Sequence, residues 1–350
     1  MHPRRRENLE VSELAEVLAK VDSEDQLSAV LALPDHLRDA LWRVDSAGIE
    51  AHESSGMILC GMGGSAIGAD LASAVLGDRN QRPITVVRGY SLPAWATPDH
   101  TVILSSYSGN TEETMSCFAA AGELGARRIA ATTGGALAEA ARDEGVSVIG
   151  LPAGLQPRAA VGYTFTVAAE MASASGAGES LRSEIEGAAT YVELARDALV
   201  DRAGEIADAL ADVTPLLYGN GLTAPVAYRW KTQMNECSKL HAFANVLSEL
   251  DHNEIVGWGG APEGVFGAVF LEDRDQHARI RRRIELTAEL IAPRAASVTR
   301  LETEGETRAE RLLWTVMLGD LLSLHLAARR GVDPTPVEVI EHLKDELGRP

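Results

Sequence analysis

The chain has 350 residues, of which 45% are hydrophobic and 24% charged, an ordinary globular composition with enough length for two domains. Its formal net charge of −19 and its aromatic content of only 5% argue against nucleic acid and anionic membrane as partners. An anionic substrate must therefore be held by local hydrogen-bond donors, against an unfavourable overall field.

The three cysteines, Cys60, Cys117 and Cys237, lie far apart and form no CxxC pair. This pattern predicts free thiols in a reducing compartment, and neither a disulfide framework nor a zinc ribbon. The basic start of the chain runs directly into polar residues, so it lacks the apolar core of a signal peptide. No apolar run approaches the length of a transmembrane helix, and we expect a cytoplasmic protein.

Strands and helices alternate along the first half of the chain. Residues 8 to about 50 have the apolar spacing of helices and predict a helical lead-in to the first domain. Short apolar runs predict strands, joined by helices, at residues 57–60, 84–87, 102–104, 128–132 and 146–149. The alternation indicates an α/β fold with a doubly wound parallel sheet and helices on both faces. Ligands of such sheets bind at the carboxyl ends of the strands.

The second half repeats this plan after a loop and two helical stretches near 166–175 and 179–200. Strands are predicted at 215–221, 264–271 and 296–301, and helices at 278–291, 308–330 and 337–347. We therefore predict two doubly wound α/β domains. The expected division is 1–155 for the lead-in and first domain, 156–205 for a helical connector, and 206–350 for the second domain.

A hydroxyl-rich turn, Ser105 to Thr114, follows the predicted strand at 102–104 and precedes a helix. Ser106, Ser108 and Thr111 place three hydroxyls on this turn, and Gly109 allows a ligand to approach the backbone closely. Hydroxyls beside a helix N-terminus suit a phosphate monoester. The alternative is a Ser/Thr-rich helix cap that binds nothing.

A second turn, Gly61-Met-Gly-Gly-Ser-Ala-Ile-Gly68, follows the strand at 57–60 and carries Gly64 and Ser65. It also fits the loose dinucleotide fingerprint GxGxxG/A, and Arg88 stands where an NADP enzyme could use an arginine. A dinucleotide domain does not need the hydroxyl-rich turn, however. Two hydroxyl-bearing turns converge better on one small phosphate.

The pair GMGGSAIG and SYSGNTEET resembles the sugar isomerase (SIS) domain, which binds phosphosugars. More specific are the stretches 229–239 (RWKTQMNECSK), 249–258 (ELDHNEIVGW), 157–163 (PRAAVGY) and 341–344 (EHLK). They are similar to the bifunctional phosphoglucose/phosphomannose isomerase family, which has tandem SIS domains. The resemblance covers the chain from about residue 40 to its end. It implies interconversion of glucose 6-phosphate and mannose 6-phosphate with fructose 6-phosphate through a cis-enediolate.

The resemblance assigns the proton-transfer role to Glu236. Such an isomerase needs one group that takes the proton from C2 and returns it to C1, and a carboxylate suffices if its pKa lies near the working pH. From the residues alone, a helix carboxylate paired with Lys231 or Lys239 is the favoured explanation of Glu236, because exposed carboxylates outnumber catalytic ones.

His252 is the candidate for ring opening, because histidine can relay a proton between the ring oxygen and the C1 hydroxyl near neutral pH. Arg158 and Lys344 are candidates to offset charge on the enediolate oxygens. Asn235 and Asn253 are expected to orient the base and the histidine. A surface histidine in a polar loop and a solvated helix lysine remain the simpler explanations of His252 and Lys344.

No HxH, HExxH or Cys/His cluster has metal-ligand spacing, so we expect no metal and no other cofactor. A small phosphosugar is the expected partner. The resemblance also implies a homodimer in which His252 is donated to the neighbouring subunit's site, whereas an intrasubunit loop is the simpler structure. An isomerase of another phosphosugar, or a phosphosugar-sensing regulator, remains an alternative function.

Overall fold

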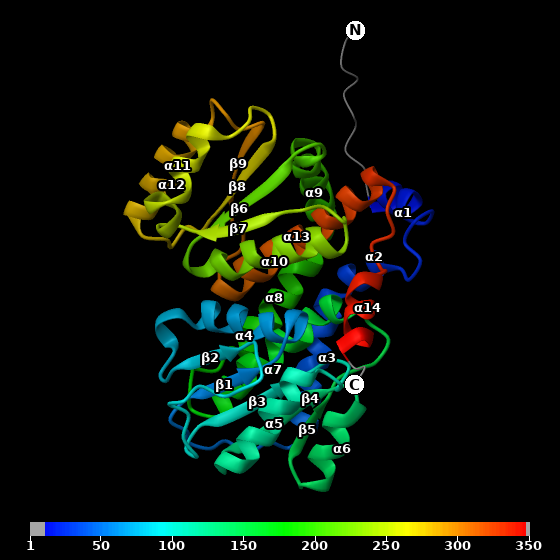
Figure 1. The fold of residues 1–350 in the computed structure, drawn as a ribbon, viewed down its shortest axis with the longest axis vertical. Coiled ribbons are helices and arrows are strands. Elements are labelled where there is room, and N and C mark those ends of the chain that lie inside the picture. The colour runs from blue at the N-terminus through cyan, green and yellow to red at the C-terminus, as the bar shows by residue number, and fades with distance from the viewer. Residues whose placement is uncertain (1–10, 348–350) are drawn as a thin grey trace.

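The computed structural model describes residues 11–347. They form two parallel β-sheets with helices packed on and between them (Figure 1). The first sheet has the strand order β2-β1-β3-β4-β5, and every neighbouring pair is parallel. Its strands are β1 (Met57–Cys60), β2 (Ile84–Val87), β3 (Thr101–Ser105), β4 (Arg127–Thr132) and β5 (Ser147–Gly150). The strand that follows β1 in sequence, β2, lies on one side of it, and β3 lies on the other, so the order of the strands reverses between β1 and β3. Ligands of such sheets bind at the carboxyl ends of the two strands where this change occurs.

Alternate residues of the first sheet enter different cores. Met57 and Leu59 of β1 face a core built with α3 (Leu33–Ser46), α4 (Gly63–Leu76) and α7 (Val161–Ala174). Ile58 and Cys60 face a second core with α5 (Glu112–Leu124) and α6 (Gly135–Asp143). Because both faces are covered, β1 and β3 are buried throughout and read as continuous apolar runs.

The second sheet has the order β7-β6-β8-β9 and is also parallel. Its strands are β6 (Thr214–Gly219), β7 (Phe243–Val246), β8 (Phe266–Glu272) and β9 (Ser297–Glu302). The edge strand β7 was missed by the sequence prediction. It has only four residues, none of them buried, so it lacks both the apolar run and the alternation that mark a strand.

The remaining helices, apart from the projecting last helix, form the lead-in, the layer between the sheets and the outer face of the second sheet (Figure 1). They are α1 (Val11–Leu18), α2 (Gln26–Leu31), α8 (Arg182–Leu194), α9 (Arg196–Leu210), α10 (Ala224–Glu236), α11 (Glu254–Gly257), α12 (Ala278–Ile291), α13 (Arg308–Arg330) and α14 (Glu338–Leu347). Short 3₁₀ turns are η1 (Gly77–Arg79), η2 (Pro157–Ala160), η3 (Gly221–Thr223), η4 (Glu249–His252) and η5 (Trp258–Gly260). The architecture confirms the predicted pair of parallel α/β sheets.

The central helix is α13, which begins with a Thr307–Glu310 capping box and ends at Gly331 in a left-handed conformation. By its length and composition alone this helix could cross a membrane. However, 94% of its most apolar window is buried within the protein. The central position of this helix explains why its residues are buried on all sides.

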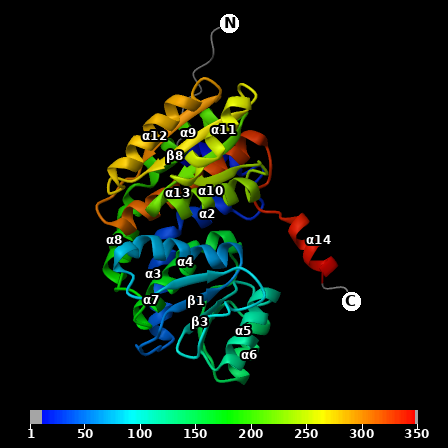
Figure 2. The same ribbon diagram turned by 60° about the vertical axis from the view of Figure 1, so that its left-hand side comes forward.

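The last helix, α14, stands away from the rest of the chain (Figure 2). None of its residues is buried, and Val339, Leu343 and Leu347 are exposed. The linker before it, by contrast, is held tightly to the protein, as described below.

Candidate active site

The turn after β1 is shaped by close backbone contact. Gly64, in the first turn of α4, lies so close to η2 that a Cβ there would be 2.5 Å from the carbonyl oxygen of Pro157. Next to it, the buried Ser65 hydroxyl accepts a hydrogen bond of 3.1 Å from the backbone N–H of Tyr107. This bond joins the turn after β1 to the turn after β3. It also leaves the hydroxyl hydrogen of Ser65 free to donate to a ligand.

The turn after β3 gathers the other predicted hydroxyls. The oxygens of Ser106 and Thr111 lie 2.8 Å apart, and Ser108 accepts from the N–H of Asn110 at 3.3 Å. Gly109 has φ of +73°, and a Cβ there would lie 1.8 Å from the carbonyl oxygen of Gly134. No other residue fits at that position.

Thr111 is the N-cap residue of α5, but its side chain makes no capping hydrogen bond. Its hydroxyl turns to Ser106 instead, so helix capping does not account for it. The two turns thus bring Ser65, Ser106, Ser108 and Thr111 to adjacent strand ends beside the N-termini of α4 and α5. Hydroxyl donors and free helix amides together suit a dianionic group.

Glu236 is the last residue of α10 and lies next to Arg158 of η2. The Arg158 Nη1 is 3.4 Å from a carboxylate oxygen of Glu236, whose side chain is 31% exposed. Since Gly64 packs against the backbone of Pro157 and Arg158, this pair adjoins the first hydroxyl-bearing turn. The structure therefore brings together Glu236, Arg158 and the turn with Ser65, although they are far apart in sequence.

Arg158 is itself buried and held by the linker before α14. Its Nη2 donates to the carbonyl oxygens of Pro334 and Thr335, both at 2.7 Å, while its Nε–H has no described partner. The Lys239 ammonium donates hydrogen bonds to the carbonyl oxygens of Glu236 and Pro336. Burial lowers the pKa of the Lys239 ammonium. Sequence reasoning gave Lys239 no role beyond a possible partner for Glu236.

His252 lies apart from Glu236. It is exposed at the end of η4, and no hydrogen bond or ion pair joins it to Glu236 within residues 11–347. The loop around it is firmly held, because Asp251 accepts from Arg283 at 2.9 Å and Glu254 accepts from Tyr218 at 2.6 Å.

The side-chain amides of the two asparagines donate to groups other than Glu236 and His252. The Asn235 amide donates to the carbonyl oxygen of Leu240 at 2.8 Å, and Asn253 donates to Glu249 at 2.8 Å. Lys344 lies on the projecting α14 and, in the described chain, makes no contact with Glu236 (Figure 2). The structure thus leaves both side-chain roles of the asparagines unsupported and places Lys344 outside the cluster.

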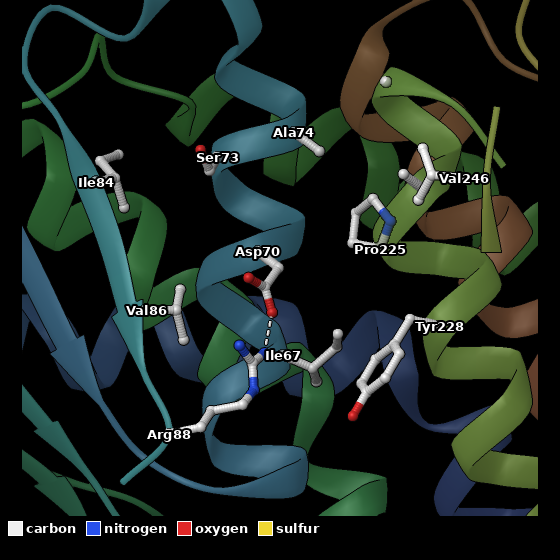
Figure 3. Close-up of a pocket in the computed structure, with 12 residues that line it drawn as sticks. Ile67, Asp70, Ser73, Ala74, Ile84, Val86, Arg88, Pro225, Tyr228 and Val246 are labelled. Carbon is white, nitrogen blue, oxygen red and sulfur yellow. Dashed lines mark hydrogen bonds and ion pairs between the residues drawn. The ribbon is translucent and has the colours of Figure 1, made fainter. Parts of the chain in front are cut away.

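A groove of about 670 Å³ lies between the two sheets, along α4, α10 and the edge strands β2 and β7 (Figure 3). Aliphatic side chains line most of it, and an Asp70–Arg88 ion pair stands at one end. Burial raises the pKa of Asp70 despite the guanidinium beside it. Arg88 is thus engaged by Asp70, and none of the predicted phosphate-binding hydroxyls lines this groove.

Among residues 11–347 no group of three or more His, Cys, Asp or Glu is arranged to hold a metal ion. Cys60, Cys117 and Cys237 are all free and buried. The groups that the structure gathers near Glu236 are the hydroxyls and helix amides of the two turns, the Arg158 guanidinium and the Lys239 ammonium.

Comparison with known proteins places this geometry in a family. Residues 199–347 match the family described as bacterial phospho-glucose isomerase C-terminal SIS domain. A protein of Caldicellulosiruptor bescii named bifunctional phosphoglucose/phosphomannose isomerase is 38% identical over 91% of this chain and 98% of its own length. One of Aquifex aeolicus with the same name is 35% identical over 83% of this chain and 90% of its own. The chain belongs to the bifunctional phosphoglucose/phosphomannose isomerase family.

Other members of this structural class share the fold of the whole chain. A hypothetical protein from Thermus thermophilus superimposes with a TM-score of 0.72 at 16% identity, covering 96% of this chain and 94% of that one. The tagatose-6-phosphate ketose/aldose isomerase of Escherichia coli gives a TM-score of 0.65 at 16% identity, with coverages of 89% and 96%. At this identity the likeness establishes the tandem-sheet fold of this family member and nothing further.

Proposed function

We propose that this enzyme interconverts glucose 6-phosphate and mannose 6-phosphate with fructose 6-phosphate. The observation that carries the proposal is the contact of Glu236 with Arg158, next to a turn rich in phosphate-binding groups, in a member of this isomerase family. The 6-phosphate binds Ser65, Ser106, Ser108 and Thr111 and the N–H groups around Gly64. The sugar carbons then extend from this turn toward Glu236.

In the proposed reaction, the Glu236 carboxylate takes the proton from C2 of the open-chain aldose and returns it to C1. The electrons of the C2–H bond form the enediolate, and the C1 oxygen gains a proton as the C2 hydroxyl loses one, so no external oxidant or reductant is needed. Arg158 offsets the negative charge that develops on the enediolate oxygens. The buried guanidinium is well suited to this role, because surrounding protein excludes water from it.

His252 opens the sugar ring in the proposed mechanism, and it does so in the site of a second subunit. Its exposure in a rigid loop supports this, because the side chain is presented outward without its own Glu236 as partner. Exposed apolar residues flank the loop, with Phe243 54% and Val256 78% exposed. Such residues are typical of a surface that a partner covers. A two-fold homodimer would then contain two equal shared sites.

A mixing experiment tests the shared site. Glu236→Gln and His252→Ala homodimers should each be nearly inactive. If His252 acts in trans, each mixed dimer has one site with both defects and one with neither. Co-refolding equal amounts then restores about a quarter of wild-type activity, for random pairing into closed dimers. Mixed dimers that form but stay inactive would show that His252 acts within its own chain.

Lys344 is proposed to assist at the enediolate when α14 moves. The linker residues 334–336 are hydrogen-bonded to Arg158 and Lys239, so α14 starts at the edge of the site. Lys344 is two turns further along a helix that nothing covers. We also propose that the enzyme is cytoplasmic, in keeping with its three free thiols.

One relative favours testing a second substrate class. A protein of Sulfolobus acidocaldarius named D-glucosamine-6-phosphate 4-epimerase is 27% identical over 70% of this chain. A spectrophotometric assay on a panel of hexose, pentose and amino-sugar 6-phosphates separates the possibilities. Turnover of glucose and mannose 6-phosphates supports the proposal, and turnover of amino sugars alone contradicts it. Binding of the panel without any turnover would indicate a phosphosugar-sensing regulator.

A further inference from the structure

A buried ion pair joins α10 to α13 behind the proposed site. Arg229 donates through Nε to one carboxylate oxygen of Asp320 at 3.0 Å and through Nη2 to the other at 2.6 Å. The two residues are only 1% and 3% exposed. Burial raises the pKa of Asp320 even against the adjacent guanidinium, which reflects the cost of removing a charge from water. Because well-packed apolar residues often serve stability at least as well, stability alone does not explain such a pair.

A third hydrogen bond leads from this pair to the site. The Nη2 of Arg229 also donates to the backbone carbonyl oxygen of Arg158 at 2.9 Å. The side chain of Arg158 reaches Glu236 and the linker carbonyls, so its backbone and its guanidinium are fixed by different parts of the chain. Arg229 is the side chain that fixes the backbone.

The helix α10 carries both Arg229, which contacts the Arg158 backbone, and Glu236, which contacts the Arg158 side chain. Arg229 and Glu236 are seven residues apart, about two turns and roughly 10 Å along the helix axis. The helix is fixed on α13 by the bond from the Trp230 indole to the carbonyl oxygen of Thr315, at 2.9 Å. Gly319 permits this contact, since a Cβ there would lie 2.0 Å from the Trp230 Nε1. Asp320, the next residue, is thereby held facing Arg229.

We propose that Arg229 and Asp320 are positioning residues that hold Arg158 at its working distance from Glu236. The inference rests on the proposed function, in which Glu236 transfers the proton and Arg158 faces the enediolate. Asp320 fixes the rotamer of Arg229, Arg229 fixes the backbone of Arg158, and Arg158 presents its guanidinium beside the carboxylate. Neither Arg229 nor Asp320 touches the substrate.

The test replaces both charges together, as Arg229→Gln with Asp320→Asn. The amides can still bond to each other, so no buried charge is left unpaired, but the shorter Gln loses the Arg158 carbonyl. A matched control is Arg311→Gln with Asp273→Asn. That pair is equally buried, at 2% and 4% side-chain exposure with a 2.7 Å contact, and shares helix α13 without contacting Arg158. If the first double variant does not fold, Arg229→Lys keeps the charge pair and loses the bidentate geometry.

The expected result is a fall in kcat of about ten- to a hundredfold with KM for fructose 6-phosphate within about twofold, because small misplacement of catalytic groups is costly and the phosphate turns are untouched. The control pair should show similar thermal destabilisation and wild-type kcat. In the Arg158→Gln background the same double substitution should cause no further loss, since the two act through one residue.

An unchanged kcat, a loss equal to that of the control, or full additivity with Arg158→Gln would overturn the inference. The proposed function fails separately, if Glu236→Gln retains wild-type activity. A variant set in which Glu236→Gln is inactive and Arg229→Gln/Asp320→Asn is fully active therefore rejects only the positioning role.

Discussion

The two sheets of this enzyme are built on one plan but end in different chemistry. In both, the strand next to the edge strand ends in a glycine-containing turn that leads into a helix, β1 into α4 and β6 into η3 and α10. After β1 the turn leaves Ser65 with a hydroxyl hydrogen to donate. After β6 the polar groups of the turn bond to one another, because Asn220 and Thr223 form a capping box.

The second turn is closed further by its neighbours. The Thr223 hydroxyl donates to the carbonyl oxygen of Leu271 at 2.8 Å, and the Asn220 amide donates to that of Leu247. The strand beside it, β8, ends in the buried acids Glu272 and Asp273, which bind Arg300 and Arg311. Where β3 of the first sheet ends in serines, β8 ends in carboxylates. We therefore expect an anion to bind at the strand ends of the first sheet and not at those of the second.

Two sheets of one plan thus serve a single proposed site. The second sheet contributes helix α10 with Glu236 at its end, and the first contributes the hydroxyl-bearing turns proposed to bind the phosphate. Arg158 lies where the two meet, next to Glu236.

The largest expected effect comes from the group that the second sheet supplies. Glu236→Gln keeps the side-chain shape but removes the proton acceptor, and should lower kcat for both aldoses by about 10²–10⁴-fold. Binding of a 6-phosphate ligand, measured by calorimetry, should persist because the first sheet is intact. An effect on kcat below tenfold would redirect attention to Glu249 or Glu254.

The next-largest effect tests the proposed phosphate site by comparing matched substitutions in the turns of the two sheets. Ser108→Ala with Thr111→Ala removes donors to a dianion, each worth about 1.5–3 kcal/mol, so KM should rise by at least tenfold. Thr223→Ala is the matched change in the second sheet. It should lower thermal stability and leave KM unaltered, because the Thr223 hydroxyl is directed to the carbonyl oxygens of Asn220 and Leu271. Equal KM values for the double variant and the wild type would remove the phosphate site from the first sheet.

A smaller effect concerns stability in acid. Burial lowers the pKa of His325 on α13 to about 4, and its Nε2–H donates to the carbonyl oxygen of Val200 at 3.0 Å. The unfolded chain binds a proton near pH 6.5 and the folded chain does not, so stability falls as pH drops from 6.5 toward 4. This histidine should cost about 2–3 kcal/mol of unfolding free energy at pH 4.5 relative to pH 7.

Denaturant unfolding of wild type and His325→Gln at both pH values measures this contribution. The variant should lose less stability on acidification, because Gln does not titrate. Parallel losses in the two proteins would contradict the prediction, because the carboxylates are common to both and only His325 differs.

Removal of metal ions is expected to have no effect on activity. Prolonged chelation should leave turnover of glucose 6-phosphate and of mannose 6-phosphate unchanged, since the proposed proton transfer uses only Glu236, Arg158 and His252. Activity lost on chelation and restored by Zn²⁺ or Mg²⁺ would mean that distant residues assemble a metal site.

Much of the fold could be read from the sequence because the sheets are buried on both faces. Short apolar runs between turn residues, such as Met57–Cys60, are typical of strands buried on both faces. The helices Ala278–Ile291 and Arg308–Arg330 were predicted with the bounds that the structure shows. The strand β7 was not, since half-exposed residues in a four-residue segment carry no periodic signal.

The site was predictable only in part. Hydroxyls on adjacent strand ends follow from local pattern, but the contact of Arg158 with Glu236 spans 78 residues and rested on family resemblance alone. Arg229 and Asp320, 91 residues apart, were not predicted. A signal was present, since Asp320 interrupts the apolar sequence Leu312–Leu326. A charge within such a segment requires a buried partner.

The linker before α14 has a consequence for how the chain tolerates sequence change. Arg158 binds the carbonyl oxygens of Pro334 and Thr335, and Lys239 binds that of Pro336, so the contacts are made to backbone and not to side chains. Substitutions at these positions that keep the backbone path preserve all three bonds. A one-residue deletion between Gly331 and Val337 shifts every carbonyl out of place. Natural or engineered variation in this segment is therefore constrained in length far more than in residue identity.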